Sequence, residues 1–320
     1  MHVVVTDHSF PDLELERTIV AAGGARLTAA QTKVAAELEK ACADADAVIT
    51  QFAPVNAGVV NAMRKAKVIV RYGIGVDNVD LEAARARGIP VCNVPDYCID
   101  EVADHTLAFI LAATRQVVPH SNAVHAGRWA LGCPPSGMRT LAGSTVGVVG
   151  FGRIGRGVVR RLVAFGGRVL VSDPLAAAAD VTAAGAEAVP LDRLFAESDI
   201  VTLHCPSLPQ TRGMVGRERL AAMKPGAVLV NLSRGDLIDS AAVVEALAAG
   251  RLGGAALDVF APEPIPAGHP ILGRGDVVLA PHIASVSAAA VERLRRTAAE
   301  LAVAALRGEP LPTVVNGVGR

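Results

Sequence analysis

The chain contains 320 residues, a length that suggests two domains rather than one. Hydrophobic residues make up 51% of the chain and charged residues 19%, which supports packed cores and excludes an intrinsically disordered protein. The 31 basic side chains balance the 31 acidic ones. This balance argues against nucleic acid as the main partner, because phosphate-binding surfaces normally carry a basic excess.

The same residues give no sign of a membrane or an export route. No uninterrupted apolar stretch approaches the roughly 18 residues of a membrane span, and the opening Met1-His2-Val3 lacks the basic region of a secretory signal. The five cysteines are scattered and form no Cys-x-x-Cys pair, so we interpret them as small core residues in a reducing compartment. We expect a cytoplasmic protein without a membrane partner or a metal site.

Short β-branched runs alternate with Ala-rich helical stretches along the chain. Several runs are continuously apolar, as is typical of strands buried on both faces of a parallel sheet. Repeated strand–helix–strand units predict a doubly wound α/β fold. The expected strands are residues 3–6, 47–50, 68–72, 91–94, 146–149, 169–172, 200–204, 228–232, 255–259 and 277–280.

Two longer helical stretches, at residues 101–116 and 288–307, interrupt this rhythm and count against the alternative of an eight-unit barrel. Asp100 is a suitable N-cap for the first, and Gly308 with Pro310 stops the second. We interpret both stretches as crossovers between two domains, one inserted into the other. The predicted domains are residues 1–99 with 288–320, and residues 100–287.

A dinucleotide-binding signature begins at the fifth expected strand. The apolar strand that begins at Thr145 runs into Gly-x-Gly-x-x-Gly, and an amphipathic helix follows. Gly150 permits the tight turn, Gly152 lets a pyrophosphate approach the backbone, and Gly155 lets the helix pack on the strand. The helix N-terminus offers free N–H groups and a positive dipole end to phosphates. The predicted phosphate-binding residues are Gly150, Gly152, Arg153, Ile154 and Gly155.

Asp173 indicates which dinucleotide binds. It ends the next expected strand, about 20 residues past the glycines, where a carboxylate hydrogen-bonds the adenosine ribose. A carboxylate at this place repels a 2′-phosphate, and the following Pro174-Leu175-Ala176 supplies no basic group to bind one. The sequence therefore predicts NAD rather than NADP.

Five further motifs lie outside the glycine signature. Two are in the N-terminal part of the chain, Arg71-Tyr72-Gly73-Ile74-Gly75-Val76-Asp77-Asn78 and Cys92-Asn93-Val94-Pro95. Three follow the signature, Val230-Asn231-Leu232-Ser233-Arg234-Gly235, Leu257-Asp258-Val259-Phe260-Ala261-Pro262-Glu263-Pro264, and Leu279-Ala280-Pro281-His282-Ile283-Ala284-Ser285.

With these motifs, the chain from about Tyr72 to Ser285 resembles the D-isomer-specific 2-hydroxyacid dehydrogenases, the family of phosphoglycerate, glycerate and D-lactate dehydrogenases. The two N-terminal motifs look closest to the branch that contains the carboxyl-terminal binding protein corepressors. The resemblance implies a Rossmann NAD-binding domain inserted into a flavodoxin-like substrate domain. It also implies a homodimer formed through the arm at residues 117–141.

The resemblance implies a role for three charged side chains. Arg234 would bind the substrate carboxylate and polarise its 2-oxo group, which a planar, permanently charged fork does well. His282 would supply the proton that the alkoxide needs after hydride transfer, and Glu263 would pair with it. His204, also at a strand end, is the nearest competitor but lacks a matching carboxylate motif.

Other positions carry over as binding residues. Gly73, Ile74 and Gly75 follow an expected strand and could turn backbone N–H groups toward the substrate carboxylate, although an ordinary turn is the alternative. Asp258 would contact the nicotinamide end of the cofactor, and Val94 would touch cofactor or substrate. The remaining predicted cofactor contacts are Thr106, Cys205, Pro206, Thr211, Leu232, Ser233 and Ser285.

The expected reaction is hydride transfer between nicotinamide C4 and C2 of a D-2-hydroxy or 2-oxo acid, in a cleft that closes to exclude water. Gln51-Phe52 stands where phosphoglycerate dehydrogenases tend to carry a basic residue, which makes a phosphorylated substrate less expected. Two alternatives remain. One is an NAD(H)-binding corepressor-like interaction protein with little turnover, which would keep the same three side chains. The other is formate dehydrogenase, a family that shares the fold but has Gln in place of Glu263, so Glu263 counts against it.

Overall fold

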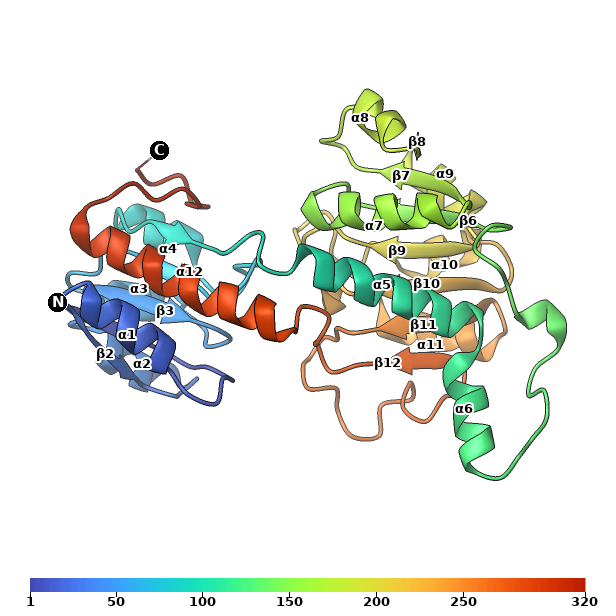
Figure 1. The fold of residues 1–320 in the computed structure, drawn as a ribbon, viewed down its shortest axis with the longest axis horizontal. Helices are drawn as coiled ribbons and strands as arrows, with labels where there is room; N and C mark the ends of the chain where they lie inside the picture. Colours follow the sequence, from blue (N-terminus) through green and yellow to red (C-terminus); the bar gives the residue numbers. More distant parts are fainter. Residues whose placement is uncertain (320) are drawn as a thin grey trace. The chain divides into compact units, whose positions relative to one another are not determined.

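The computed structural model describes residues 1–319, and the chain divides into two compact units. Unit 1 contains residues 1–97 together with the segment that begins at Ser287, and unit 2 contains Cys98–Val286. Each unit is built on its own parallel sheet with helices on both faces (Figure 1). This confirms the predicted pair of doubly wound α/β domains. Across residues 1–319, no helix has the length and apolar character needed to cross a bilayer.

The sheet of unit 1 has the strand order β2-β1-β3-β4-β5 in the part of the chain that the structure describes. All its pairings are parallel. This is the flavodoxin-like order, in which the chain reverses direction along the sheet between β1 and β3. The strands are β1 (His2–Val5), β2 (Arg26–Ala29), β3 (Ala47–Thr50), β4 (Ile69–Arg71) and β5 (Val91–Cys92).

Helices cover both faces of this sheet. On one face, α12 contacts α1, β3 and β4. On the other face, residues of α2, α3 and α4 share a buried core with β3, β4 and β5. The helices are α1 (Glu14–Ala22), α2 (Ala35–Cys42), α3 (Ala57–Ala62), α4 (Leu81–Ala86) and α12 (Ala288–Arg307). The long helix α12 begins at an N-cap, Ser287, and ends at Gly308 with φ +73°, as its sequence predicts.

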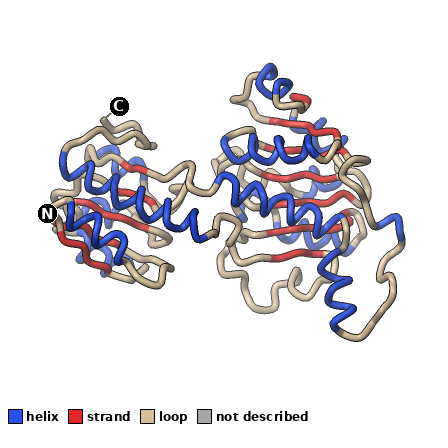
Figure 2. Tube along the Cα trace, viewed as in Figure 1, coloured by secondary structure: helices blue, strands red, loops and turns tan. Residues whose placement is uncertain are grey.

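The sheet of unit 2 has the order β12-β11-β10-β9-β6-β7-β8 within residues 98–286 (Figure 2). Its reversal point lies between β6 and β9, where dinucleotide-binding sheets open a crevice at the carboxyl ends of the strands. The strands are β6 (Thr145–Val149), β7 (Arg168–Ser172), β8 (Glu187–Ala188), β9 (Ile200–Leu203), β10 (Ala227–Asn231), β11 (Leu252–Leu257) and β12 (Val277–Leu279).

Two layers of helices enclose this second sheet. Helices α5 and α7 pack against each other on one face, and α9, α10 and α11 lie on the other. Figure 1 shows α6 projecting away from the sheet of its unit. The helices are α5 (Ile99–Thr114), α6 (Val117–His125), α7 (Arg153–Ala164), α8 (Ala178–Ala183), α9 (Leu191–Glu197), α10 (Arg217–Ala222) and α11 (Ser240–Ala248), with 3₁₀ turns at Pro135–Gly137 and Gly235–Leu237.

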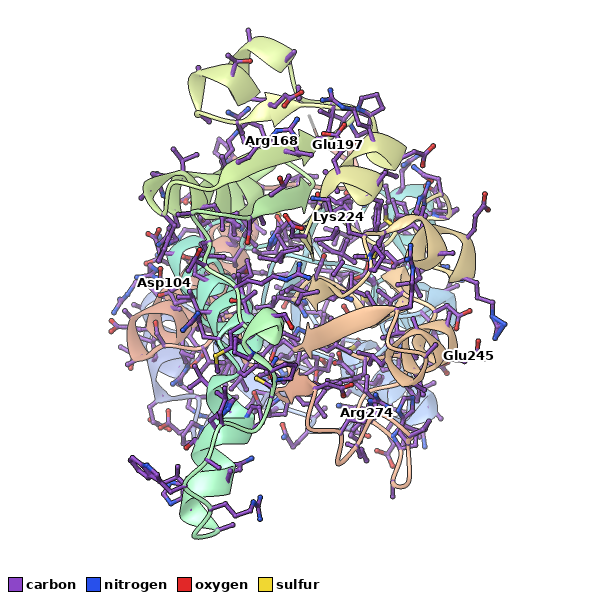
Figure 3. The ribbon with its side chains drawn as sticks, turned by 90° about the vertical axis from the view of Figure 1, so that its right-hand side faces the viewer. Asp104, Arg168, Glu197, Lys224, Glu245 and Arg274 are labelled. Carbon is purple, nitrogen blue, oxygen red and sulfur yellow. The ribbon has the colours of Figure 1, made fainter. Side chains whose placement is uncertain are left out.

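Two edge strands, β2 and β8, were not predicted from the sequence. Only Leu27 of β2 is buried, and β8 contains two residues, so neither gives an apolar run. An ion-pair network holds β8 at its edge. Arg168 pairs with Glu187 at 2.7 Å and with Glu197 at 2.9 Å, and Figure 3 shows Arg168 and Glu197 side by side.

Candidate active site

The glycine loop of unit 2 lies at the reversal point of its sheet. Gly150 has φ +99°, and a Cβ atom there would lie 2.6 Å from the carbonyl oxygen of His204 at the end of β9. A Cβ atom on Gly155 would lie 2.1 Å from the oxygen of Gly150. At Gly152, the N-cap of α7, a Cβ atom would meet nothing within 4 Å. Packing therefore explains two of the glycines, and the open space at Gly152 suits a pyrophosphate close to the backbone.

Asp173 lies beside this loop. Its Oδ2 atom accepts the Phe151 N–H at 2.6 Å, and its Oδ1 atom accepts the Leu175 N–H at 2.8 Å. The carboxylate is thus held at the carboxyl end of β7, next to the phosphate loop. Its position fits an NAD ribose, because the segment after it carries no basic side chain.

Several predicted cofactor contacts gather around the ends of β9 and β10. The Ser233 hydroxyl donates to the Cys205 carbonyl at 2.6 Å, and the Thr211 hydroxyl donates to the Pro206 carbonyl at 2.7 Å. Burial raises the pKa of the Cys205 thiol to about 11, so this side chain stays uncharged at neutral pH.

Two other predicted cofactor residues are turned into the protein. Thr106 is fully buried in α5, and its hydroxyl donates to the Val102 carbonyl at 2.7 Å. Leu232 is buried where β10 ends. A cofactor contact by either residue stays a prediction.

His282 and Glu263 form the central contact of the site. The Nδ1 atom of His282 lies 2.8 Å from the Oε2 atom of Glu263, and both side chains are about one-third exposed, at 33% and 35%. The other carboxylate oxygen accepts the Phe260 N–H at 2.9 Å. Burial alone would raise the pKa of Glu263, but the hydrogen bonds from His282 and Phe260 and the positive charge of Arg234 lower it overall. Glu263 is therefore an anion at neutral pH.

Asp258 fixes the turn that carries His282. Its carboxylate is fully buried and accepts the N–H groups of Ile283 at 2.8 Å and Ala284 at 2.9 Å, while its carbonyl accepts the His282 N–H at 2.7 Å. His282 has φ +56°, a left-handed conformation that is costly for a residue with a side chain. Both Asp258 oxygens bind the backbone of this turn, so its predicted contact with the nicotinamide stays a prediction. Ser285 follows directly after the turn.

Arg234 lies in the loop after β10, next to the loop that carries Glu263. Asn231 donates from Nδ2 to the Arg234 carbonyl at 2.8 Å and fixes its backbone. A Cβ atom on Gly235 would lie 2.0 Å from the carbonyl carbon of Phe260, so the two loops touch through their backbones. Unit 2 therefore gathers Arg234, Glu263 and His282, which we call the charged triad, from the loops after three neighbouring strands.

We expect Gly235→Ala to separate these two loops. The added methyl group cannot be accommodated by a side-chain rotation, because the obstacle is backbone. Overpacking of this kind costs about 1–3 kcal/mol, so the variant should lose stability to that extent and lose activity more steeply. Thermal unfolding with and without NADH measures the first effect, and Gly275→Ala is a suitable control because Gly275, like Gly235, does not have a left-handed φ, but a Cβ atom there would meet nothing within 4 Å.

The competing histidine has a different environment. The Nε2 atom of His204 lies 2.9 Å from the Thr202 hydroxyl, and burial lowers the pKa of His204 to about 4. It is therefore neutral at pH 7, and its ring contacts a hydroxyl rather than a carboxylate. Within residues 1–319, no group of three or more His, Cys, Asp or Glu side chains is arranged to hold a metal ion.

In unit 1, the predicted glycine turn exposes two backbone donors. Gly73 has φ +145°, its carbonyl accepts the Val94 N–H at 2.9 Å, and the Ile74 carbonyl accepts Nδ2 of Asn93 at 2.7 Å. These two contacts fix the carbonyl groups of the turn. The N–H groups of Ile74 and Gly75 have no hydrogen-bond acceptor within the described chain. We call this pair of donors the backbone nest; it is suited to an anion.

Arg71, which lies beside this turn, was not predicted as a site residue. A Cβ atom on Gly73 would lie 1.5 Å from Nη1 of Arg71, so the guanidinium lies directly against the glycine turn. A charged residue at the carboxyl end of a buried parallel strand, just before glycine, was the signal that could have identified it.

A buried polar network anchors Tyr72, two residues before the nest. Glu16 is fully buried, accepts the Tyr72 hydroxyl at 3.1 Å, and pairs with Arg295 of α12 through Nε at 2.8 Å and Nη2 at 2.7 Å. Phe10 packs edge-on against Tyr72 and lies under the Arg295 guanidinium. This network fixes the strand end that leads into the nest, and no local sequence pattern predicts it.

Comparison with known proteins identifies the family. Residues 107–284 match the family described as D-isomer specific 2-hydroxyacid dehydrogenase, NAD binding domain. A glyoxylate reductase of Korarchaeum cryptofilum is 41% identical over 276 residues, covering 85% of this chain and 83% of that protein. A D-3-phosphoglycerate dehydrogenase of Mycobacterium leprae is 40% identical over 281 residues, covering 88% of this chain but 53% of that protein, so the chain spans about half of its length.

A solved structure gives the same result. The D-lactate dehydrogenase of Aquifex aeolicus, crystallised with NAD and lactic acid, matches with a TM-score of 0.90 at 27% identity, covering 98% of this chain and 99% of that one. The chain belongs to the D-isomer-specific 2-hydroxyacid dehydrogenase family. It is an NAD-dependent dehydrogenase of that family, as its motifs predict. The predicted similarity of its N-terminal motifs to the corepressor branch stays a prediction.

Proposed function

We propose that the protein interconverts a D-2-hydroxy acid and its 2-oxo acid, with His282 as the acid and base of the reaction. The observation that carries this proposal is the 2.8 Å contact between His282 and Glu263, beside Arg234. A histidine fixed by an anionic carboxylate is suited to hold a proton and to release it.

Each member of the charged triad has its own task in this proposal. NAD(H), when bound, accepts or supplies the hydride at C2 of the substrate. In the reducing direction, His282 gives the proton on its other ring nitrogen, Nε2, to the carbonyl oxygen, and Glu263 stabilises the imidazolium before transfer. Arg234 holds the substrate carboxylate through paired hydrogen bonds and draws charge from the 2-oxo group. In the oxidising direction His282 removes the hydroxyl proton.

The binding residues divide between cofactor and substrate. The open backbone at Gly152 and the start of α7 would hold the cofactor pyrophosphate, and Asp173 would accept the ribose hydroxyls. The side chains around Cys205 and Ser233 would line the cofactor further along. For unit 1, we propose that the backbone nest at Ile74 and Gly75 contributes N–H donors to the substrate carboxylate.

The arm at residues 117–141 is our proposed homodimer contact. It carries apolar side chains that its own unit leaves exposed, among them Trp129 at 89% and Leu131 at 58%. Apolar side chains gathered on one projecting segment mark protein interaction sites. We also propose a cytoplasmic location, which the five free cysteines support.

A steady-state screen tests the function. We expect NADH oxidation with at least one small 2-oxo acid. Arg234→Met should lower kcat/KM by about 10- to 100-fold, the effect of losing a charge-assisted hydrogen-bond pair. Arg217→Met is the control, because Arg217 of α10 is an exposed arginine that pairs with Glu245 of α11 at 2.5 Å. Intact NADH binding without turnover of any 2-oxo acid would contradict the proposal and favour the corepressor-like alternative.

A further inference from the structure

We infer that Asn93 is a positioning residue for the substrate carboxylate, and that Thr313, near the end of the chain, holds Asn93 in place. Asn93 acts on the backbone nest at Ile74 and Gly75 through the carbonyl group of Ile74. The inference rests on the proposed function, because it assumes that the nest binds the carboxylate of a 2-oxo acid. It depends only on residues within unit 1.

Each donor of the nest shares a rigid peptide group with a carbonyl that the protein fixes. The peptide groups of this turn are trans, so each is planar and its C=O and N–H bonds point in opposite directions. The Ile74 N–H belongs to the same peptide group as the Gly73 carbonyl, and the Gly75 N–H to the same group as the Ile74 carbonyl. A hydrogen bond to either carbonyl therefore sets the direction of the N–H on the other side.

Two consecutive residues supply these hydrogen bonds. Val94 donates its N–H to the Gly73 carbonyl at 2.9 Å, and Asn93 donates from Nδ2 to the Ile74 carbonyl at 2.7 Å. Any residue except proline could make the first contact, because its donor is backbone. The second contact needs a side-chain donor, which the buried Asn93 provides. The type of residue at position 93 therefore decides whether the second peptide group is fixed.

Fixing the peptide groups prepares the nest for an anion. A carbonyl that accepts a hydrogen bond polarises its peptide group, so the N–H on the other side becomes a stronger donor. A turn that is ordered before binding also loses less conformational entropy when the ligand arrives. Without the Asn93 side chain, the peptide group between Ile74 and Gly75 loses this donor and is free to rotate away from the carboxylate.

The C-terminal segment at residues 313–316 fixes the backbone of Asn93. Strand β5 is an edge strand of its sheet, and the segment pairs with it antiparallel through the bridge between Cys92 and Val314. Thr313 accepts the Asn93 N–H through its carbonyl at 3.4 Å and donates its hydroxyl to the Asn93 carbonyl at 2.7 Å. Both backbone groups of Asn93 are thus held by one residue that lies 220 positions further along the chain.

A second asparagine anchors this segment. Asn316 is buried, its Oδ1 atom accepts the Val91 N–H at 3.1 Å, and its Nδ2 atom donates to the Ile89 carbonyl at 2.9 Å. The segment is therefore docked along β5 by the protein alone. Thr313 holds Asn93 whether or not a substrate is bound.

Asn93→Ala should raise KM for a small 2-oxo acid about 10-fold, while kcat and the dissociation constant of NADH stay within about twofold of the wild-type values. The carboxylate keeps its charge during hydride transfer, so the nest binds substrate and transition state alike, and loss of such binding appears in KM. Oxamate, an analogue of a 2-oxo acid that is not reduced, gives a second measurement. Its dissociation constant from the NADH complex should also rise about 10-fold.

Thr313→Val should raise KM and the oxamate dissociation constant about threefold, because it removes the hydroxyl that holds the Asn93 carbonyl. Thr313→Ser keeps this hydroxyl and should restore the wild-type values. Asn56→Ala is the control, since the Asn56 side chain also makes one hydrogen bond to the backbone of unit 1, accepting the Val59 N–H at 3.1 Å at the start of α3. It should lower the melting temperature but change neither constant.

If Asn93→Ala keeps the wild-type KM and oxamate affinity, or if Asn56→Ala weakens both equally, the inference is wrong while the proposed function stands. Wild-type constants in Thr313→Val would overturn the role of Thr313. If the wild-type protein binds oxamate but reduces no 2-oxo acid, the proposed reaction is wrong, and the oxamate affinities of the variants decide the inference. If it neither binds oxamate nor reduces a 2-oxo acid, both are wrong.

Discussion

His282→Asn is expected to lower kcat by about 100- to 10,000-fold, because general acid–base catalysis contributes that much to proton transfer. Asn cannot release a proton to the substrate oxygen or take one up from it. The dissociation constant for NADH, measured by fluorescence titration, should stay within about twofold of the wild-type value, since the glycine loop and Asp173 are untouched.

Two further variants show whether the loss of activity is specific to the proton transfer by His282. His269→Asn is the control, because His269 only accepts the Ile271 N–H through its ring, at 3.2 Å, and Asn can still accept. Glu263→Gln should lose less activity than His282→Asn, since Gln still accepts the Phe260 N–H but no longer stabilises an imidazolium. If His282→Asn retains wild-type turnover, His282 is not the acid and base.

Arg295→Met is expected to destabilise unit 1 by about 3–5 kcal/mol, because it leaves the fully buried Glu16 without its cation. Hydrogen exchange followed by mass spectrometry is the suitable measurement, since it reports on peptides of unit 1 separately from those of unit 2. Protection should fall in β4 and in the nest more than in peptides of α7.

Arg296→Met provides the matched control for this effect. Arg296 is the next residue of α12, and its pairing with Glu292 is exposed, at 2.8 Å with side chains 46% and 63% accessible. Exposed pairs of this kind contribute about 0–1 kcal/mol. Equal loss of protection in the two variants would show that the buried network has no special role in unit 1.

The sequence predicts the fold well where strands are buried on both faces. Such strands appear as apolar runs, so the centres of both sheets could be located, whereas β2 and β8 could not, because most of their side chains are not buried. The members of the charged triad could also be predicted, since each lies in a recognisable motif that follows a strand.

Other features of the site depend on contacts that no local pattern contains. The network of Tyr72, Glu16 and Arg295 joins residues separated by 56 and 279 positions. The left-handed backbone at His282 could not be predicted from the sequence either, because it depends on the hydrogen bonds that the buried Asp258 carboxylate accepts from Ile283 and Ala284.

The way in which Asp7 holds the loop after β3 determines which residues of this loop can be substituted. Asp7 binds the peptide N–H groups of Gln51, Phe52 and Ala53, which every residue except proline possesses. The exposed side chain at position 52 can therefore be exchanged without loosening this loop, whereas Gln51 is buried and its side chain also holds Ser9 through two hydrogen bonds. The exposed surface of this loop can therefore vary at position 52 while its backbone stays the same.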